Sequence, residues 1–163
     1  MKKVKVGKID IAYQWDGLQD GPVLMMAHAM GTSYRIWDQQ IGALQAKYKI
    51  LRYDWRGHGS TSAPDGPYTL EEFVDDAIGT MNALGIQTVN WVGISTGGMI
   101  GQGLAIRYPE RISSLVLCNT TSQSDVWYKN WVKERQAVVK DGGMPPVWDC
   151  LLYTSPSPRD DEL

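Results

Sequence analysis

Ser95 stands in the stretch GISTG (93–97), which satisfies the pattern GxSxG. The apolar run TVNWVGI (88–94) precedes it, and the helix-like run GGMIGQGLAIRY (97–108) follows it. Between a strand and a helix, this pattern indicates a nucleophile elbow, a sharp turn that exposes the serine hydroxyl. Glycines suit such a turn, because side chains beside the serine would collide. The alternative is a serine that only caps a helix after a tight turn.

Two backbone N–H groups are candidates for holding a developing oxyanion. The N–H of Thr96 follows the serine at a helix N-terminus, where the positive potential favours an anion. The second donor is expected in the loop after VLMMAH (23–28), and Met30 N–H is the candidate there. Ser95, Met30 and Thr96 are therefore the predicted catalytic residues, with Ser95 as nucleophile.

A serine hydroxyl becomes a strong nucleophile when a base takes its proton, usually a histidine that a carboxylate orients. The sequence has two histidines, His28 and His58, and both precede Ser95. His28 belongs to the predicted oxyanion loop, so a structural or loop-shaping role is expected. His58 lies in the glycine-rich turn RGHGS (56–60), which it is expected to organise. No histidine follows Ser95 to activate it.

Strand-like and helix-like patterns alternate along the chain. Residues 3–15 alternate polar and apolar side chains around Gly7, which predicts a hairpin. Apolar runs at 23–28, 48–54, 88–94 and 112–119 predict buried strands of a parallel sheet. Helices are predicted where apolar residues recur at helical spacing, over 37–48, 69–84 and 97–108. The second starts at a capping box of Thr69 and Glu72, and the third ends before Pro109.

This alternation predicts an α/β fold with a mainly parallel sheet and an N-terminal hairpin. In open α/β sheets, ligands bind at the carboxyl ends of the strands. The loops that carry Met30, His58 and Ser95 all follow predicted strands. We therefore expect these three loops to meet at one edge of the sheet.

The composition limits the class of ligand. The net charge is −2 and the pI is near 5.6, so no basic surface for nucleic acid or anionic lipid is expected. No apolar run approaches bilayer length and the N-terminus lacks the pattern of a secretory signal, which predicts a cytoplasmic protein. The two cysteines have no metal-ligand spacing. A small molecule, with neither cofactor nor metal, is the expected partner. A nucleotide-binding fold is a weaker alternative, because the glycines of 97–103 do not follow the first strand.

AHAMGT (27–32), YDWRGHGST (53–61) and the run WVGISTGGMIGQGLAIRYPERISSLVLCNT (91–120) together resemble the α/β-hydrolase family. Within it, ISTGGMIGQGLA and the spacing of residues 131–144 resemble 3-oxoadipate enol-lactonases, which open an anionic enol-lactone with water. Thr96 is a departure, since a bulkier apolar residue is commoner there. The resemblance implies a serine hydrolase that acts on a small ester or lactone, including anionic ones.

The resemblance also implies three segments. Residues 1–123 would form the N-terminal part of the core, and 124–148 would begin a helical lid in which Trp131 and Arg135 face the substrate. Residues 149–163 leave the family pattern and resemble sequencing-adapter read-through, or form a disordered natural tail. Family members carry the triad aspartate and histidine on later strands, so the expected fold is truncated before the last two strands and inactive. A non-catalytic small-molecule-binding protein on a hydrolase scaffold is the alternative.

Overall fold

The computed structural model describes residues 1–123, 130, 133–134, 137 and 139–142. The chain divides into two compact units, 1–122 and 123–163. In the second unit, the described residues from 130 to 142 are helical. The predicted tail at 149–163 lies outside the described residues. The first unit carries the elbow at Ser95.

The first unit contains a six-stranded sheet in the order β1-β2-β4-β3-β5-β6. The strands are β1 (Lys2–Val6), β2 (Ile9–Gly17), β3 (Val23–Ala27), β4 (Lys49–Tyr53), β5 (Val89–Ile94) and β6 (Ile112–Cys118). β1 and β2 form the predicted antiparallel hairpin, and β2 also runs antiparallel to β4. The pairs β3–β4, β3–β5 and β5–β6 are parallel. The prediction of a mainly parallel sheet with an N-terminal hairpin is confirmed.

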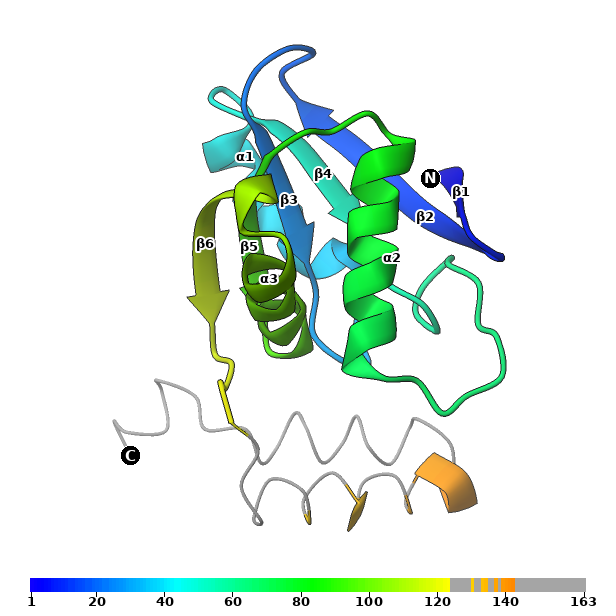
Figure 1. The fold of residues 1–163 in the computed structure, drawn as a ribbon. Coiled ribbons are helices and arrows are strands. Elements are labelled where there is room, and N and C mark those ends of the chain that lie inside the picture. Colours follow the sequence, from blue (N-terminus) through cyan, green and yellow to red (C-terminus); the bar gives the residue numbers. More distant parts are fainter. Residues whose placement is uncertain (124–129, 131–132, 135–136, 138, 143–163) are drawn as a thin grey trace, which may run out of the picture. The chain divides into compact units, whose positions relative to one another are not determined.

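Helices cover both faces of this sheet (Figure 1). On one face lie α2 (Leu70–Ala83) and α3 (Thr96–Arg107), and on the other lies the short α1 (Asp38–Leu44). Single 3-10 turns, η1 (Tyr34–Trp37) and η2 (Pro109–Arg111), precede α1 and β6. The predicted capping box starts α2, because Thr69 accepts from the backbone N–H of Glu72 and the Glu72 carboxylate accepts from the N–H of Thr69.

Each face of the sheet has its own apolar core. The larger core lies under α2 and α3 and includes Trp55, Trp91 and Ile100, all nearly or fully buried. The smaller core, on the α1 side, is built on Leu24, Met26, Trp37 and Ile50. β3 contributes to both cores, since successive side chains of a strand point to opposite faces. This explains why its sequence is one continuous apolar run.

The helix predicted over 37–48 is shorter than its apolar spacing suggested. It begins as η1 and ends at Leu44, and the N–H groups of Lys47 and Tyr48 both donate to the Leu44 carbonyl in the turn that follows. Tyr48 still packs against the smaller core together with Ile41 and Leu44. The apolar spacing therefore reports a shared core, while the turn into β4 interrupts the helix.

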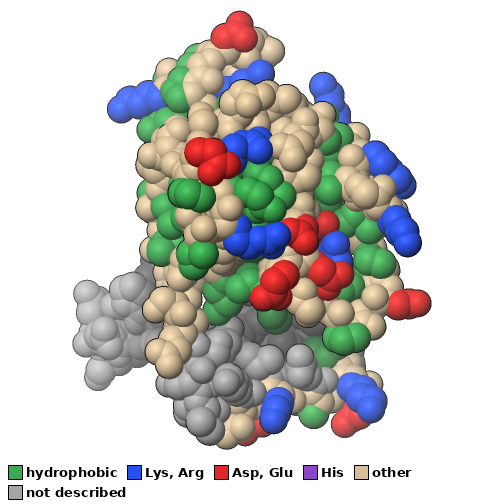
Figure 2. Space-filling view, in the orientation of Figure 1, with side chains coloured by type: hydrophobic (Ala, Val, Ile, Leu, Met, Phe, Trp, Pro, Cys, Tyr) green, Lys and Arg blue, Asp and Glu red, His purple; other side chains and the backbone are tan. Residues whose placement is uncertain are grey.

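The surface over α2 and α3 carries mixed charge. Figure 2 shows acidic and basic side chains lying next to one another on this face, with apolar side chains between them. One such pair joins the two helices, with Arg107 Nη2 2.7 Å from Asp75 Oδ1. Among the described residues, no helix combines the length and the apolar character needed to cross a bilayer.

Candidate active site

Ser95 occupies the turn between β5 and α3 in a strained backbone conformation. Its φ of 53° and ψ of −118° lie in a region that residues with a side chain rarely adopt. Its N–H still pairs with the Cys118 carbonyl of β6 at 3.0 Å, so the strand ladder continues up to the turn. Its hydroxyl caps nothing in α3. This geometry disfavours the helix-cap interpretation and fits a nucleophile elbow.

Close packing explains the glycines around the serine. A Cβ on Gly93 would lie 2.2 Å from the carbonyl oxygen of Gly97, and a Cβ on Gly97 would lie 2.3 Å from that of Ala27. A Cβ on Gly98 would lie 2.7 Å from the Thr120 side chain. Since real Cβ contacts essentially never fall below 3.0 Å, all three positions exclude a side chain. The start of α3 is thus pressed against the ends of β3 and β6.

The two predicted oxyanion donors lie on neighbouring elements. Thr96 is the first residue of α3, where a backbone N–H has no acceptor within the helix. Met30 lies in the turn after β3 and is 53% exposed. The register of β3 with β5 places Ala27 opposite Gly93, so the loop after β3, which carries Met30, starts beside the elbow. The assignment of both N–H groups to an oxyanion hole remains a prediction.

Asp54, directly after β4, is a buried carboxylate that the sequence reasoning did not single out. It is 1% exposed. Its Oδ1 accepts from the N–H of Tyr34 at 2.8 Å, and its Oδ2 accepts from the N–H of Ser60 at 3.0 Å. Gly59 must lack a side chain, because a Cβ there would lie 2.0 Å from Asp54 Oδ2. Asp54 therefore fastens the loop after β3 to the glycine-rich turn. The signal for it was a charged residue directly after a buried apolar strand.

His28 is buried beneath the loop that it begins. Its ring stacks on Trp55 with 5.1 Å between ring centroids, and its Nδ1 lies 2.8 Å from the Ala29 carbonyl. Its Nε2 lies 3.8 Å from Asp54 Oδ1 and has no hydrogen-bond partner in the described part of the chain. Burial lowers the pKa of His28 to about 4, so the ring is neutral near pH 7. These contacts support the loop-shaping role expected for His28.

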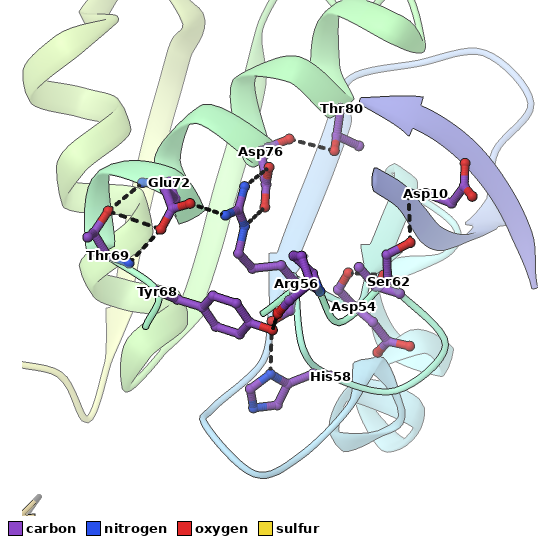
Figure 3. Close-up of polar contacts among 12 residues, drawn as sticks. Asp10, Asp54, Arg56, His58, Ser62, Tyr68, Thr69, Glu72, Asp76 and Thr80 are labelled. Atoms are coloured by element: carbon purple, nitrogen blue, oxygen red, sulfur yellow. Dashed lines mark hydrogen bonds and ion pairs between the residues drawn. The ribbon is translucent and has the colours of Figure 1, made fainter. Parts of the chain in front are cut away.

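The turn at residues 54–62 is tied to α2 by Arg56. Figure 3 shows the guanidinium of Arg56 pointing toward Asp76 and Glu72. It donates two hydrogen bonds to the Asp76 carboxylate, at 2.6 and 2.8 Å, and a third to Glu72. A planar guanidinium suits this paired contact, which fixes direction as well as distance. His58 extends from the same turn and contacts the loop after β3, since its Nε2 lies 3.0 Å from the Gly31 nitrogen.

Thr120, which follows β6, binds the backbone of the elbow. It was not singled out from the sequence. Its hydroxyl donates to the Ser95 carbonyl oxygen at 2.7 Å. Nearby, Gln102 on α3 donates from its side-chain amide to the Thr121 carbonyl at 3.1 Å. No periodic or motif signal marks Thr120, because the contact depends on the turn after β6 folding back over α3.

Comparison with known proteins agrees with this geometry. The α/β hydrolase fold family matches residues 22–144, which include the elbow, the loop after β3 and the glycine-rich turn. The chain belongs to the α/β-hydrolase fold family. This confirms the resemblance inferred from the motifs, and with it a hydrolase scaffold. Members of this fold position a nucleophile at the strand–helix turn, which is where the structure places Ser95.

Among curated α/β-hydrolase relatives, 3-oxoadipate enol-lactonase 2 of Acinetobacter baylyi is 34% identical over 85% of this chain and 51% of its own length. A putative carbamate hydrolase, RutD, of Caulobacter segnis is 31% identical over 75% of this chain and 46% of its own length. The chain thus spans about half the length of the curated relatives it matches.

Solved α/β-hydrolase structures superpose closely. The enol-lactonase of Burkholderia xenovorans LB400 has a TM-score of 0.85 at 34% identity, covering 93% of this chain and 58% of the other. A hydrolase from Pseudomonas aeruginosa PA01 has a TM-score of 0.87 at 34% identity, covering 98% of this chain and 60% of the other.

The predicted substrate-facing residues Trp131 and Arg135 lie outside the described residues, so their role remains a prediction. Within the described part, no group of three or more histidine, cysteine, aspartate or glutamate side chains is placed to hold a metal ion.

Proposed function

We propose that this protein is a serine hydrolase that opens a small ester or lactone, with a 3-oxoadipate enol-lactone-like compound as the preferred substrate class. The observation that carries the proposal is the strained backbone of Ser95 at the N-terminus of α3. The 34% identity to an enol-lactonase supports the substrate class. Ser95 would attack the carbonyl carbon, and the N–H groups of Met30 and Thr96 would hold the oxyanion.

The base that activates Ser95 is a separate part of the proposal. Both histidines of the sequence have other contacts. His28 contacts the Ala29 carbonyl and faces Asp54, while His58 contacts the Arg56 carbonyl and the Gly31 N–H. We therefore propose that neither serves as the base, and that residues 1–163 alone turn over slowly. Loss of the histidine from a complete triad lowers turnover by about a million-fold.

Hydrolysis of an enol-lactone and of an aryl ester by the 163-residue polypeptide tests this proposal. We expect turnover roughly a thousandfold to ten-thousandfold above water at most, the level that binding and an oxyanion hole provide. Rapid turnover that Ser95→Ala abolishes and Ser122→Ala leaves intact would support Ser95 as the nucleophile. It would contradict the proposal that neither histidine activates this serine. Rapid turnover that survives Ser95→Ala would contradict the nucleophile.

The alternative is a non-catalytic binding protein. It rests on the same observation, that both histidines contact groups other than Ser95. A binding protein on this scaffold would hold an anionic lactone without opening it. Saturable binding by a complete gene product that shows no Ser95-dependent turnover would favour this alternative over the hydrolase. Turnover that Ser95→Ala abolishes in that complete product would exclude it.

Arg135 is proposed to pair with the carboxylate of an anionic lactone, since a guanidinium can bind a carboxylate through two hydrogen bonds. Arg135→Ala is expected to raise the dissociation constant for such a lactone about tenfold, while Lys133→Ala serves as the charge-matched control. Calorimetric titration measures both. Equal affinity in the Arg135 variant and the unmodified protein would remove this residue from the proposal.

A further inference from the structure

His58 is held in one tautomer by its two partners. Its Nε2 lies 3.0 Å from the backbone nitrogen of Gly31, and its Nδ1 lies 3.2 Å from the carbonyl oxygen of Arg56. A backbone N–H can only donate, so Nε2 must accept. The ring proton then resides on Nδ1, which donates to the Arg56 carbonyl. Both ring nitrogens are satisfied only while the ring is neutral.

The ring of His58 is fixed by its surroundings. It packs against the Trp55 ring with 3.6 Å between centroids, and it lies 5.3 Å from the His28 ring. The backbone of its turn is closed by hydrogen bonds from His58 N–H to the Trp55 carbonyl and from Thr61 N–H to the His58 carbonyl, both 3.1 Å. The ring that carries the acceptor for Gly31 N–H is therefore held by packing, on a turn that its own backbone hydrogen bonds close.

The loop after β3 depends on this acceptor at its middle. Its start is held where Trp55 Nε1 donates to the His28 carbonyl at 3.2 Å, and its end where Tyr34 N–H donates to Asp54. Inside the loop, Thr32 bonds locally to Ala29 through its N–H and its hydroxyl. Among the described residues, one hydrogen bond links residues 29–33 to a distant part of the chain. It runs from the Gly31 N–H to His58 Nε2. It fixes the peptide unit between Met30 and Gly31.

We propose that His58 is the positioning residue of the loop after β3, which carries Met30. Its neutral Nε2 holds the Gly31 N–H, and protonation of the ring releases the loop. The consequence for catalysis, that the preceding peptide unit with its Met30 N–H then loses its aim at the oxyanion, rests on the proposed function. The hydrogen bond and its dependence on protonation do not. His58 thus acts through the loop and never touches substrate.

The charges around His58 set the pH range of this release. Burial lowers the pKa of His58 below its usual value of 6.5, while the Arg56 carbonyl and the Asp54 carboxylate oppose that shift. His28, which faces the same ring, has a pKa of about 4 and is neutral above that pH. The ring of His58 is therefore neutral at pH 7 and gains its proton below pH 6.5. Once protonated, Nε2–H and Gly31 N–H are two donors facing each other.

Two substitutions separate the acceptor from the rest of the side chain. In His58→Gln the amide oxygen can reach the position of Nε2, whereas in His58→Asn the amide reaches only as far as Nδ1. Amide hydrogen exchange of Gly31, read by NMR at pH 7, is the measurement. We expect His58→Asn to lower Gly31 protection about fivefold and His58→Gln to restore it, because one such bond contributes about 1 kcal/mol and a factor of ten corresponds to about 1.4 kcal/mol. The Tyr34 N–H, which donates its hydrogen bond to Asp54, is the internal control. It should keep its protection in both variants.

A pH titration of the unmodified chain completes the test. We expect the protection factor of Gly31 to fall with the same midpoint, below pH 6.5, at which the ring nitrogens of His58 titrate, with Nδ1 as the protonated nitrogen above it. A Gly31 protection factor that does not change as the His58 ring titrates would overturn the proposal. So would a protection factor that His58→Asn leaves unchanged. These readouts need no substrate, so a failure of the hydrolase proposal leaves them unchanged, and their failure leaves the nucleophile assignment standing.

Discussion

The carbonyl oxygen of Ser95 accepts three hydrogen bonds, from the N–H groups of Gly98 and Met99 and from the hydroxyl of Thr120, at 2.9, 3.1 and 2.7 Å. The first two bonds belong to the start of α3. The third comes from the segment after β6 and ties a distant part of the chain to the turn. The unusual φ of Ser95 persists because its surroundings hold it from both sides.

Removal of the Thr120 hydroxyl should loosen this turn. Thr120→Val keeps the shape that packs on Gly98 but cannot donate, and it is expected to lower the free energy of unfolding by about 1 kcal/mol. Thr120→Ser keeps the donor and serves as the matched control, with a smaller loss from the missing methyl group. Urea denaturation measures both. Equal stability of Thr120→Val and the unmodified chain would show that the bond contributes nothing.

The buried His28 makes stability depend on pH. Its pKa is about 4 in the folded state against 6.5 in the unfolded chain, so the unfolded state binds more protons between these values. Stability is therefore full above pH 6.5 and falls as the pH drops toward 4, by roughly 3 kcal/mol over that window. His28→Gln should remove that part of the slope, as denaturant unfolding at several pH values can show. An unchanged slope in the variant would contradict this assignment.

The site depends on how closely α3 packs against the ends of the strands. Gly97 lies against the carbonyl oxygen of Ala27 at the end of β3, and Gly93 at the end of β5 lies against the first turn of α3. These contacts bring the loop after β3 beside the elbow. The packing therefore links the positions of the two predicted oxyanion donors, Met30 and Thr96.

A methyl group at this junction should separate these elements. Gly97→Ala places a Cβ 2.3 Å from the Ala27 carbonyl oxygen, and such overpacking typically costs about 1–3 kcal/mol. Gly42→Ala, in α1, is the control, because a Cβ there meets nothing within 4 Å and should stabilise the helix by up to about 1 kcal/mol. Thermal denaturation compares them. The idea fails if Gly97→Ala is as stable as the unmodified chain.

The sequence predicted the strands, α2, α3 and the elbow because their signals are local. Apolar runs mark buried strands, Thr69 and Glu72 mark the start of α2, and GxSxG marks the turn at Ser95. Asp54 and Thr120 were missed, since their roles arise from contacts between residues far apart in the chain. The early end of α1 was missed for a similar reason, because Tyr48 joins the same core from outside the helix.

β6 is an edge strand of the described six-stranded sheet. Its partner among the described strands is β5. Val116 and Leu117 are 49% and 43% exposed, and since neighbouring side chains on a strand face opposite ways, both faces of β6 are partly exposed here. An exposed apolar edge strand is a template for pairing with another chain.

Self-association of the 163-residue polypeptide through this edge is expected at high protein concentration. Val116→Lys should reduce it, because a lysine on an edge strand opposes strand pairing. Ile106→Lys, on α3 at a side chain that is 80% exposed, changes the charge equally without touching the edge. Sedimentation velocity over a range of concentrations distinguishes the two variants. Equal reduction by both would assign the effect to net charge.

Replacing Ser95 with cysteine tests directly whether the turn between β5 and α3 activates a nucleophile at position 95. A thiol needs no histidine to react, and one at a helix N-terminus has a lowered pKa. Rates of acylation by an aryl ester against pH, with peptide mass spectrometry to separate the new thiol from Cys118 and Cys150, give its pKa and reactivity. We predict for Ser95→Cys a thiol pKa clearly below about 8.5 and faster acylation than in the exposed control Ser122→Cys. An ordinary or raised pKa, with acylation no faster than in the control, would show that position 95 does not activate a nucleophile.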